Sequence, residues 1–235
     1  MLCEGVVARL GRFDPDPAWR TAWRSLDERV QAALERQREG EGALVRALFG
    51  VLPDGAQVVV ANSLAIRLVD EFVPVLSRRL LLYGNRGASG IDGTISTALG
   101  VAAAGDAPTM LLTGDLSFFH DQNGLLALRE EGVKLDIVLL NNDGGGIFHR
   151  LPISRFEPPF TEAFVTPHGL DFSHTARQYG LRYRRAMPEE APAALSAALA
   201  DRQTSHLLEI HTDAAASETL RRRLLASLGT LTNAP

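Results

Sequence analysis

Polar side chains end two of the most apolar stretches of the sequence. Asp115 follows "PTMLLTG", and Asn141 and Asn142 follow "LDIVLL". Carboxylate and amide oxygens are hard ligands that suit Mg²⁺ or Ca²⁺ rather than zinc. A single carboxylate is typical of Mg²⁺ that is shared with the phosphates of a bound molecule. The pattern therefore indicates a site for magnesium and a diphosphate.

The residues around these side chains favour the same chemistry. Three glycines at 144–146 follow the Asn pair, and glycine lets the backbone approach a ligand and turn a carbonyl toward it. Leu116 and Ser117 begin the helix expected after Asp115, so their N–H groups and the Ser117 hydroxyl can face a phosphate. The simpler interpretation is that Asp115 is a helix cap and the Asn pair a turn. The coincidence of both features on successive strands favours the ligand site.

Five short apolar runs alternate with helical patterns after residue 57. The expected strands are "QVVVAN", "RLLLYGNRG", "PTMLLTGD", "LDIVLLNND" and "SHLLEIHTD", and the helices between them include "LAIRLVDEFV", "TISTALGVAAA", "FFHDQNGLLALREEG" and a segment near 189–201. This alternation predicts an α/β domain with a mostly parallel sheet and helices on both faces. Such sheets bind ligands at the carboxyl ends of their strands. The polar residues singled out above all lie at those ends.

The segment before this alternation has a helical pattern and no expected strand. Residues 18–49 form a helical pattern that Gly40 and Gly42 are expected to break. We therefore expect an N-terminal helical segment over residues 1–50 and a ligand-binding domain over residues 51–235.

Composition excludes several classes of protein. The 235 residues carry a net charge of −4, so no overall basic field attracts nucleic acid. The single cysteine, Cys3, argues against a disulfide framework, and we find neither a run long enough to span a bilayer nor a signal peptide pattern. We expect a cytoplasmic protein.

The motifs resemble a known signature. "GDLSF" and "NNDGGGIF" are similar to the ends of the thiamine diphosphate motif, which begins Gly-Asp-Gly and ends Asn-Asn; here it runs from Gly114 to Asn142, with Leu116 in place of the second glycine. The stretches "NSLAIR", "GNRGASGIDGTISTALGVAAA" and "TPHGLDF" resemble one branch of that family. This branch is the SEPHCHC synthases of menaquinone biosynthesis, and the resemblance covers roughly residues 62–183.

The resemblance implies a cofactor and a metal. Thiamine diphosphate and Mg²⁺ (or Mn²⁺) would be bound, with Asp115, Asn142 and the Gly144 carbonyl as metal ligands. Ile91 matches the apolar residue that holds the cofactor in its bent shape. The full set of positions that match cofactor-binding residues is Ile91, Gly114, Leu116, Ser117, Asn142 and Ile147.

The resemblance also implies a reaction. These enzymes are transferases that decarboxylate 2-oxoglutarate and add the succinyl unit to isochorismate. Both substrates are polyanions, and arginine is the usual bidentate partner of a carboxylate. Ser63, Arg67 and Arg86 match substrate-binding positions, and the apolar wall beside them is expected from Ile147, Phe148 and Leu151.

One part of such an enzyme is not expected in this chain. The family activates thiamine through a glutamate on a pyrimidine-binding domain that another subunit of a homodimer contributes. Residues 1–50 look like the tail of the family's middle domain and its connection, and they cannot form such a domain. We therefore expect the diphosphate-binding part only, without a catalytic acid. Two alternatives stay open: another thiamine-dependent 2-oxo acid decarboxylase or carboligase, and a non-catalytic remnant or split subunit that only binds cofactor.

Overall fold

A computed structural model describes residues 16–131 and 133–232. The chain divides into two compact units, one formed by residues 16–37 with 223–232 and the other by Arg38–Arg222. In the first unit, helix α2 (Pro17–Arg36) begins after Asp16, whose Oδ1 accepts a hydrogen bond from the Ala18 N–H at 2.9 Å. The part of the N-terminal segment before residue 16 lies outside the described residues. All residues discussed below belong to the second unit.

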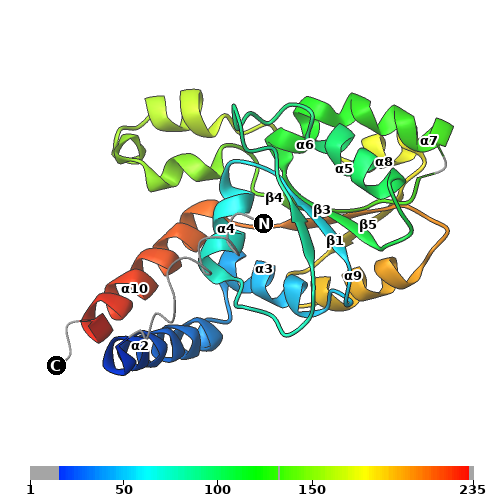
Figure 1. Cartoon of the computed structure of the whole chain (residues 1–235). Helices are drawn as coiled ribbons and strands as arrows, with labels where there is room; N and C mark the ends of the chain where they lie inside the picture. The colour runs from blue at the N-terminus through cyan, green and yellow to red at the C-terminus, as the bar shows by residue number, and fades with distance from the viewer. Residues whose placement is uncertain (1–15, 132, 233–235) are drawn as a thin grey trace. The chain divides into compact units, whose positions relative to one another are not determined.

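The second unit is built on a six-stranded parallel sheet (Figure 1). The strands are β1 (Gln57–Val60), β2 (Leu81–Tyr83), β3 (Thr109–Gly114), β4 (Asp136–Asn141), β5 (Arg182–Ala186) and β6 (His206–His211). Their order is β2-β1-β3-β4-β6-β5, and every neighbouring pair is parallel. The predicted α/β fold is confirmed.

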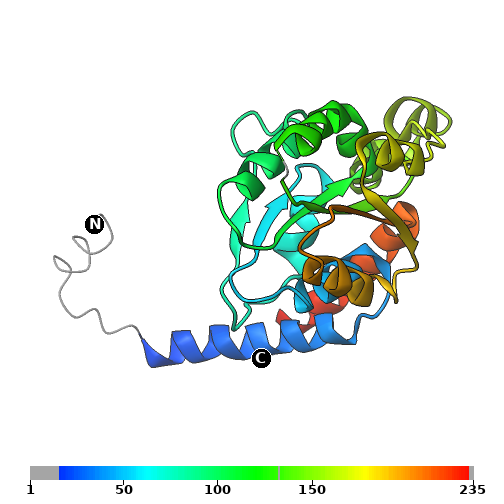
Figure 2. The ribbon, with the colours of Figure 1, turned by 90° about the vertical axis from the view of Figure 1, so that its right-hand side faces the viewer.

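Helices cover both faces of the sheet. Helices α5, α6, α7 and α8 lie on one face and α3, α4 and α9 on the other (Figure 1), and the view in Figure 2 shows the same two layers on opposite sides of the strands. The bounds are α3 (Gly40–Gly50), α4 (Leu64–Phe72), α5 (Thr94–Ala103), α6 (Asp115–Asp121), α7 (Ala127–Glu131), α8 (Ser173–Tyr179), α9 (Ala191–Ala200) and α10 (Ala214–Thr232). Three short 3₁₀ helices are η1 (Gln122–Leu126), η2 (Gly146–Arg150) and η3 (Pro152–Arg155), and η4 (Thr161–Val165) is a short π-helix.

The continuous apolar runs of the sequence are the central strands. Every residue of β1 and β4, and β3 up to Thr113, is buried, as expected for strands covered on both faces. On one face Phe118 and Phe172 meet edge to face with ring centroids 5.4 Å apart, within a cluster that includes Ile95 and Ile137. None of the described helices is long and apolar enough to cross a membrane.

The predicted break in the N-terminal helical pattern is misplaced. The helix ends at Arg36, and Gly40, with a φ of +83°, begins α3. Gly42 lies inside α3, where an added Cβ would come within 2.5 Å of the Phe72 ring. Glycine is required at position 42 because α3 packs closely on α4, a contact that the sequence pattern does not reveal.

A strand is missing from the sequence prediction. β5 contains Arg182, Arg184 and Arg185 and has no apolar run, because it lies at the edge of the sheet with most of its side chains exposed. It pairs with β6 in parallel register. Charged side chains on an edge strand are a common protection against pairing with other chains.

The strand order creates a switch point between β1 and β3. From β1 the chain moves outward to β2 and then returns to place β3 on the opposite side of β1. Ligands of open parallel sheets bind at such a point, beyond the carboxyl ends of the strands. Asn62 and Ser63 follow β1 there, and Asp115 follows β3.

Candidate functional site

Asp115 is a buried carboxylate at the end of β3, with 2% of its surface exposed. Its Oδ2 accepts hydrogen bonds from the backbone N–H groups of Asn142 and Gly144, both at 3.0 Å, and its Oδ1 accepts from Leu116 at 2.6 Å. Burial raises the pKa of Asp115, and the hydrogen bonds from Gly144 and Leu116 oppose that rise. Asp115 therefore fixes the loop after β4 to the start of α6.

The loop after β4 requires its glycines. Gly144 has a φ of +139°, and a Cβ there would stand 2.1 Å from the Val165 carbonyl oxygen. The Gly145 N–H donates to that same carbonyl at 2.7 Å. The Gly144 carbonyl accepts from the Gly146 N–H at 2.9 Å, which leaves its second lone pair for another partner.

The two asparagines have different environments. Both polar atoms of the Asn141 side chain have partners: Nδ2 donates to Glu209 at 2.6 Å, and Oδ1 accepts from the Asp143 N–H at 3.0 Å. Asn142 donates from Nδ2 to Glu41 Oε1 at 3.0 Å, whereas its buried Oδ1 has no hydrogen-bond partner among the described residues. Of the pair, Asn142 is the residue with an oxygen available for a ligand.

Glu41 is a second buried carboxylate beside Asn142. It lies in the first turn of α3, is 2% exposed, and its Oε1 also accepts from the Thr212 hydroxyl at 2.7 Å. Burial raises the pKa of Glu41, and the hydrogen bonds from Asn142 and Thr212 oppose that rise.

His168 approaches Asp115 from the loop before α8. Its Nδ1 accepts a hydrogen bond from the Leu170 N–H at 3.0 Å, which assigns the ring proton of the neutral form to Nε2. Nε2 lies 3.4 Å from Asp115 Oδ2 and has no closer hydrogen-bond partner. Asp143, with its Oδ1, accepts from the backbone N–H groups of His168 and Gly169 at 3.0 and 2.7 Å and so ties this loop to the loop after β4.

The structure brings the predicted arginines to the ends of β1 and β2. Arg67 lies on α4 and donates to the Ser63 carbonyl at 2.6 Å, and Arg86 donates to Asn62 Oδ1 at 2.7 Å. Asn62 is buried and donates in turn to the carbonyls of Asn85 and Gly90. Ser63 has a φ of +64°, a strained value for serine and of a kind that clusters at functional sites.

The remaining predicted residues lie in the loops around this edge. Ile91 is half-buried in the loop between β2 and α5, and its carbonyl accepts from Thr94. Ile147 and Phe148 are half-buried in η2, where Phe148 packs on Phe164 with ring centroids 5.5 Å apart; Leu151 is 46% exposed. Gly114 precedes Asp115 directly, and Ser117 is buried in the first turn of α6.

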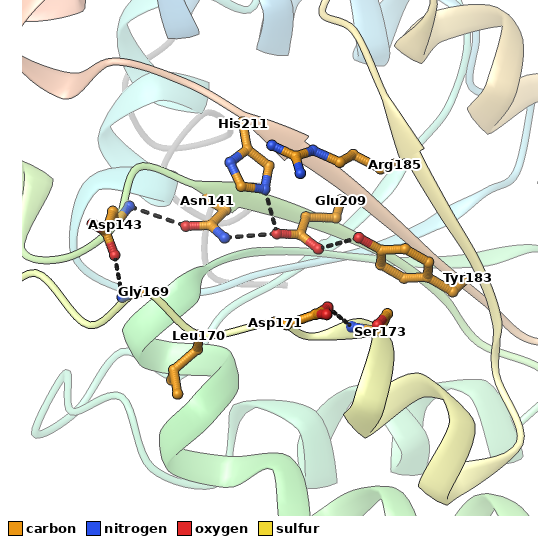
Figure 3. A pocket seen from close by; sticks show the side chains of 10 residues that line it. All are labelled: Asn141, Asp143, Gly169, Leu170, Asp171, Ser173, Tyr183, Arg185, Glu209 and His211. Atoms are coloured by element: carbon orange, nitrogen blue, oxygen red, sulfur yellow. Dashed lines mark hydrogen bonds and ion pairs between the residues drawn. The ribbon is translucent and has the colours of Figure 1, made fainter.

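A polar cavity of about 590 Å³ lies beside this site at the ends of β4, β5 and β6 (Figure 3). At its base the buried Glu209 accepts from Tyr183 at 2.7 Å and pairs with His211 Nε2 at 2.7 Å, in addition to its bond from Asn141. Burial, together with Glu209, raises the pKa of Tyr183. Glu209 thus orients Asn141, which supports the loop that carries Asn142.

The donor set fits a hard cation held jointly with a phosphate ligand. The described residues contain no group of three or more His, Cys, Asp or Glu side chains able to hold a metal. A cation here would therefore be bound by one carboxylate together with amide, carbonyl and phosphate oxygens, a combination that suits Mg²⁺. The unpartnered Oδ1 of Asn142 is the observation that supports this fit.

The sequence interpretation missed two residues of the site. Glu41 lies 101 positions before Asn142 in the chain, within a segment that was assigned to a connection. His168 lies in the "TPHGLDF" stretch, which contributes to the family resemblance, but its spacing from other residues does not match a metal-ligand pattern.

Comparison with known proteins shows the family to which this fold belongs. The family model of the thiamine pyrophosphate enzyme C-terminal TPP-binding domain matches residues 70–210. The chain therefore belongs to the thiamine pyrophosphate enzymes and contains their C-terminal TPP-binding domain. A solved structure, the thiamine diphosphate-dependent 4-hydroxybenzoylformate decarboxylase of Rhodococcus jostii, is 29% identical with a TM-score of 0.58, over 73% of this chain and 32% of that one.

Within that family the chain is similar to one kind of enzyme. It is 48% identical to the 2-succinyl-5-enolpyruvyl-6-hydroxy-3-cyclohexene-1-carboxylate (SEPHCHC) synthase of Roseiflexus castenholzii, over 92% of this chain and 38% of the relative. Identity to the synthase of Halorubrum lacusprofundi is 43%, over 95% and 40%. The resemblance predicted from the motifs is confirmed. The chain spans about two fifths of the length of these relatives.

Proposed function

We propose that this chain is the diphosphate- and magnesium-binding part of a SEPHCHC synthase. The observation that carries the proposal is the buried Asp115 carboxylate, which accepts from the backbone N–H of Asn142, a residue whose buried Oδ1 is unpartnered among the described residues, in a chain 48% identical to such a synthase. Mg²⁺ or Mn²⁺ would be bound by Asp115, Asn142 and the Gly144 carbonyl. Thiamine diphosphate, when bound, supplies the carbanion chemistry of a 2-oxo acid decarboxylation.

The residues around the metal would hold the cofactor. Gly114 and Leu116 place backbone near the diphosphate, and the Ser117 N–H and hydroxyl at the start of α6 are suited to a phosphate oxygen. Ile91 and Ile147 are half-buried apolar side chains from two loops at the same edge of the sheet, and we assign them to contacts with the cofactor rings.

The arginines would bind the substrates 2-oxoglutarate and isochorismate. Arg67 is exposed and donates to a backbone carbonyl, and no carboxylate among the described residues pairs with it. Arg86 is anchored by the amide oxygen of Asn62. With Ser63 they form a cationic group at the switch point, suited to polycarboxylates. Phe148, Ile147 and Leu151 provide the apolar surface beside it.

The proposed enzyme needs a further domain. The synthases that it resembles are more than twice as long as this chain. By resemblance to the family, we assign the thiamine-activating glutamate to a pyrimidine-binding domain of another subunit in a homo-oligomer. We assign residues 51–235 to the diphosphate domain and residues 1–50 to the connection that precedes it. A cytoplasmic location is part of the proposal and rests on the single cysteine and the kind of enzyme.

Two measurements test this proposal. In calorimetry, the chain should bind thiamine diphosphate only with Mg²⁺ and should bind ATP at least tenfold more weakly under the same conditions. Preference for ATP would show a nucleotide-binding remnant instead. In an enzyme completed with a pyrimidine-binding domain, 2-oxoglutarate should be consumed with transfer to isochorismate, and equal use of simple 2-oxo acids and aldehyde acceptors would favour a different carboligase.

A further inference from the structure

We propose that Glu41 is a positioning residue for the metal site, because its carboxylate fixes the Asn142 amide with Oδ1 directed to the cation. The inference rests on the proposed function, since it takes Asn142 as a metal ligand. Glu41 lies outside residues 70–210, the range that the family model matches. It therefore adds a residue from the preceding segment to the site.

The first argument is the chemistry of the contact. Glu41 Oε1 lies 3.0 Å from Asn142 Nδ2. The same Oε1 accepts a hydrogen bond from the Thr212 hydroxyl, so it acts as an acceptor here, and an amide NH₂ group only donates. Rotating the Asn142 amide by 180° would place two oxygens against each other in a buried environment. Glu41 thus selects the orientation in which Oδ1 faces away from it.

The second argument is the state of that oxygen. Asn142 Oδ1 is buried and has no hydrogen-bond partner among the described residues. A buried acceptor without a partner destabilises a protein, so such an arrangement calls for a ligand. A cation is the ligand that satisfies both this oxygen and the neighbouring Asp115 carboxylate.

A purely structural role for Glu41 accounts for less of the geometry. Glu41 is in the first turn of α3, where a carboxylate stabilises the helix end. Its side chain, however, accepts hydrogen bonds from Asn142 and Thr212, which come from the ends of β4 and β6 and not from α3. Only its backbone N–H is bonded toward α10, to the Ser217 hydroxyl at 3.2 Å.

The test compares three variants of the full chain. Glu41→Met has nearly the same volume but removes the acceptor, and Glu41→Gln retains an oxygen that can accept from Asn142. Glu218→Gln is the matched control, because Glu218 is another buried carboxylate in this unit but pairs with Arg150 and Arg222. Mn²⁺ binding at a fixed thiamine diphosphate concentration is followed by electron paramagnetic resonance, and unfolding is measured without metal.

Positioning predicts a specific order of Mn²⁺ affinities. E41M should weaken Mn²⁺ binding by about 10- to 100-fold, the usual effect of losing a group that orients a ligand. E41Q should recover most of this loss, and E218Q should bind Mn²⁺ as the wild type does. If E41M lowers the unfolding temperature but leaves Mn²⁺ affinity unchanged, Glu41 is structural and the inference is wrong.

A metal-free measurement separates this inference from the proposed function. The side-chain amide protons of Asn142, observed by NMR in the apo chain, should exchange slowly in the wild type and E41Q and quickly in E41M. Wild-type protein that binds no Mn²⁺ with thiamine diphosphate would overturn the proposed function. Equal exchange in the wild type and E41M would overturn the positioning role alone.

Discussion

Replacing Asp115 by Asn should abolish tight magnesium-dependent binding of thiamine diphosphate. The variant keeps the size of the side chain and removes the one carboxylate assigned to the cation. Two unit charges about 4 Å apart attract by about 4 kcal/mol at an effective dielectric constant of about 20, which corresponds to about 10³ in affinity. We therefore expect the apparent dissociation constant for the cofactor at fixed Mg²⁺ to rise by about that factor.

The apo protein should be affected much less. Burial already raises the pKa of Asp115, so the ionised carboxylate is held at some cost before a cation arrives. Against this, the N–H groups of Leu116, Asn142 and Gly144 lose a charged acceptor. These effects oppose each other, and we expect only a small change in the unfolding temperature without metal.

Titration calorimetry with thiamine diphosphate at saturating Mg²⁺ measures the loss, and thermal unfolding with and without both ligands provides the second readout. Asp70→Asn is the control, since it removes the same charge from an exposed position on α4. Cofactor affinity of D115N within about threefold of the wild type would refute the assignment of Asp115 as the charged metal ligand, on the scale of the expected loss.

Three further predictions concern other parts of the chain. In an enzyme completed with a pyrimidine-binding domain, Arg67→Ala and Arg86→Ala should each lower kcat/KM by about 10- to 150-fold at unchanged cofactor affinity. Steady-state kinetics and calorimetry measure the two quantities, and a loss of cofactor affinity with unchanged kcat/KM would show that these residues bind the cofactor instead. The 235-residue chain alone should form no product from the two substrates in a chromatographic assay. A positioned acid–base group supplies about 10²–10⁴-fold in rate, and we assign no such group to this chain. Sustained turnover by the chain alone would contradict this prediction. Burial raises the pKa of Glu71, but the hydrogen bond from Arg221 and the charge of Arg150 outweigh it and leave the pKa lowered. A carboxylate whose pKa is lowered in the folded state stabilises the fold at pH values above its unfolded pKa, and this stability is lost as the pH falls. Glu71→Gln should therefore lower the free energy of unfolding by about 1 kcal/mol at pH 7, with screening of this partly exposed group included, and by progressively less below about pH 4. Chemical denaturation measures this difference, and a difference that does not change with pH would contradict the prediction.

Much of the fold was predictable because strands buried on both faces appear in the sequence as continuous apolar runs. "PTMLLTGD" and "LDIVLLNND" became β3 and β4, and the polar residues that end them meet at one edge of the sheet. Strand β5 was not predicted, because an exposed edge strand with three arginines lacks the apolar run by which the other strands were recognised. The break before α3 was misplaced because Gly42 is required by packing on Phe72, a contact between separate helices.

The candidate site was predictable only in part for a related reason. Asp115 and Asn142 carry their chemistry in their residue types and in their position after a strand. Glu41 is separated from Asn142 by 101 positions, and only the packing of α3 beside the ends of β4 and β6 brings it there. The distinct tasks of Asn141 and Asn142 also depend on tertiary partners. Glu209 accepts a hydrogen bond from the Asn141 amide, whereas Glu41 accepts one from the Asn142 amide, whose Oδ1 has no hydrogen-bond partner among the described residues.

The central claim is that one cation is shared between this loop and the cofactor diphosphate. Crystals of the protein grown with Mn²⁺ and thiamine diphosphate, measured at the manganese absorption edge, test it most directly. We predict one strong anomalous peak about 2.0–2.3 Å from an Asp115 carboxylate oxygen, Asn142 Oδ1 and the Gly144 carbonyl oxygen, with diphosphate oxygens completing the shell. A manganese peak elsewhere, or a diphosphate bound without contact to these three residues, would contradict the account.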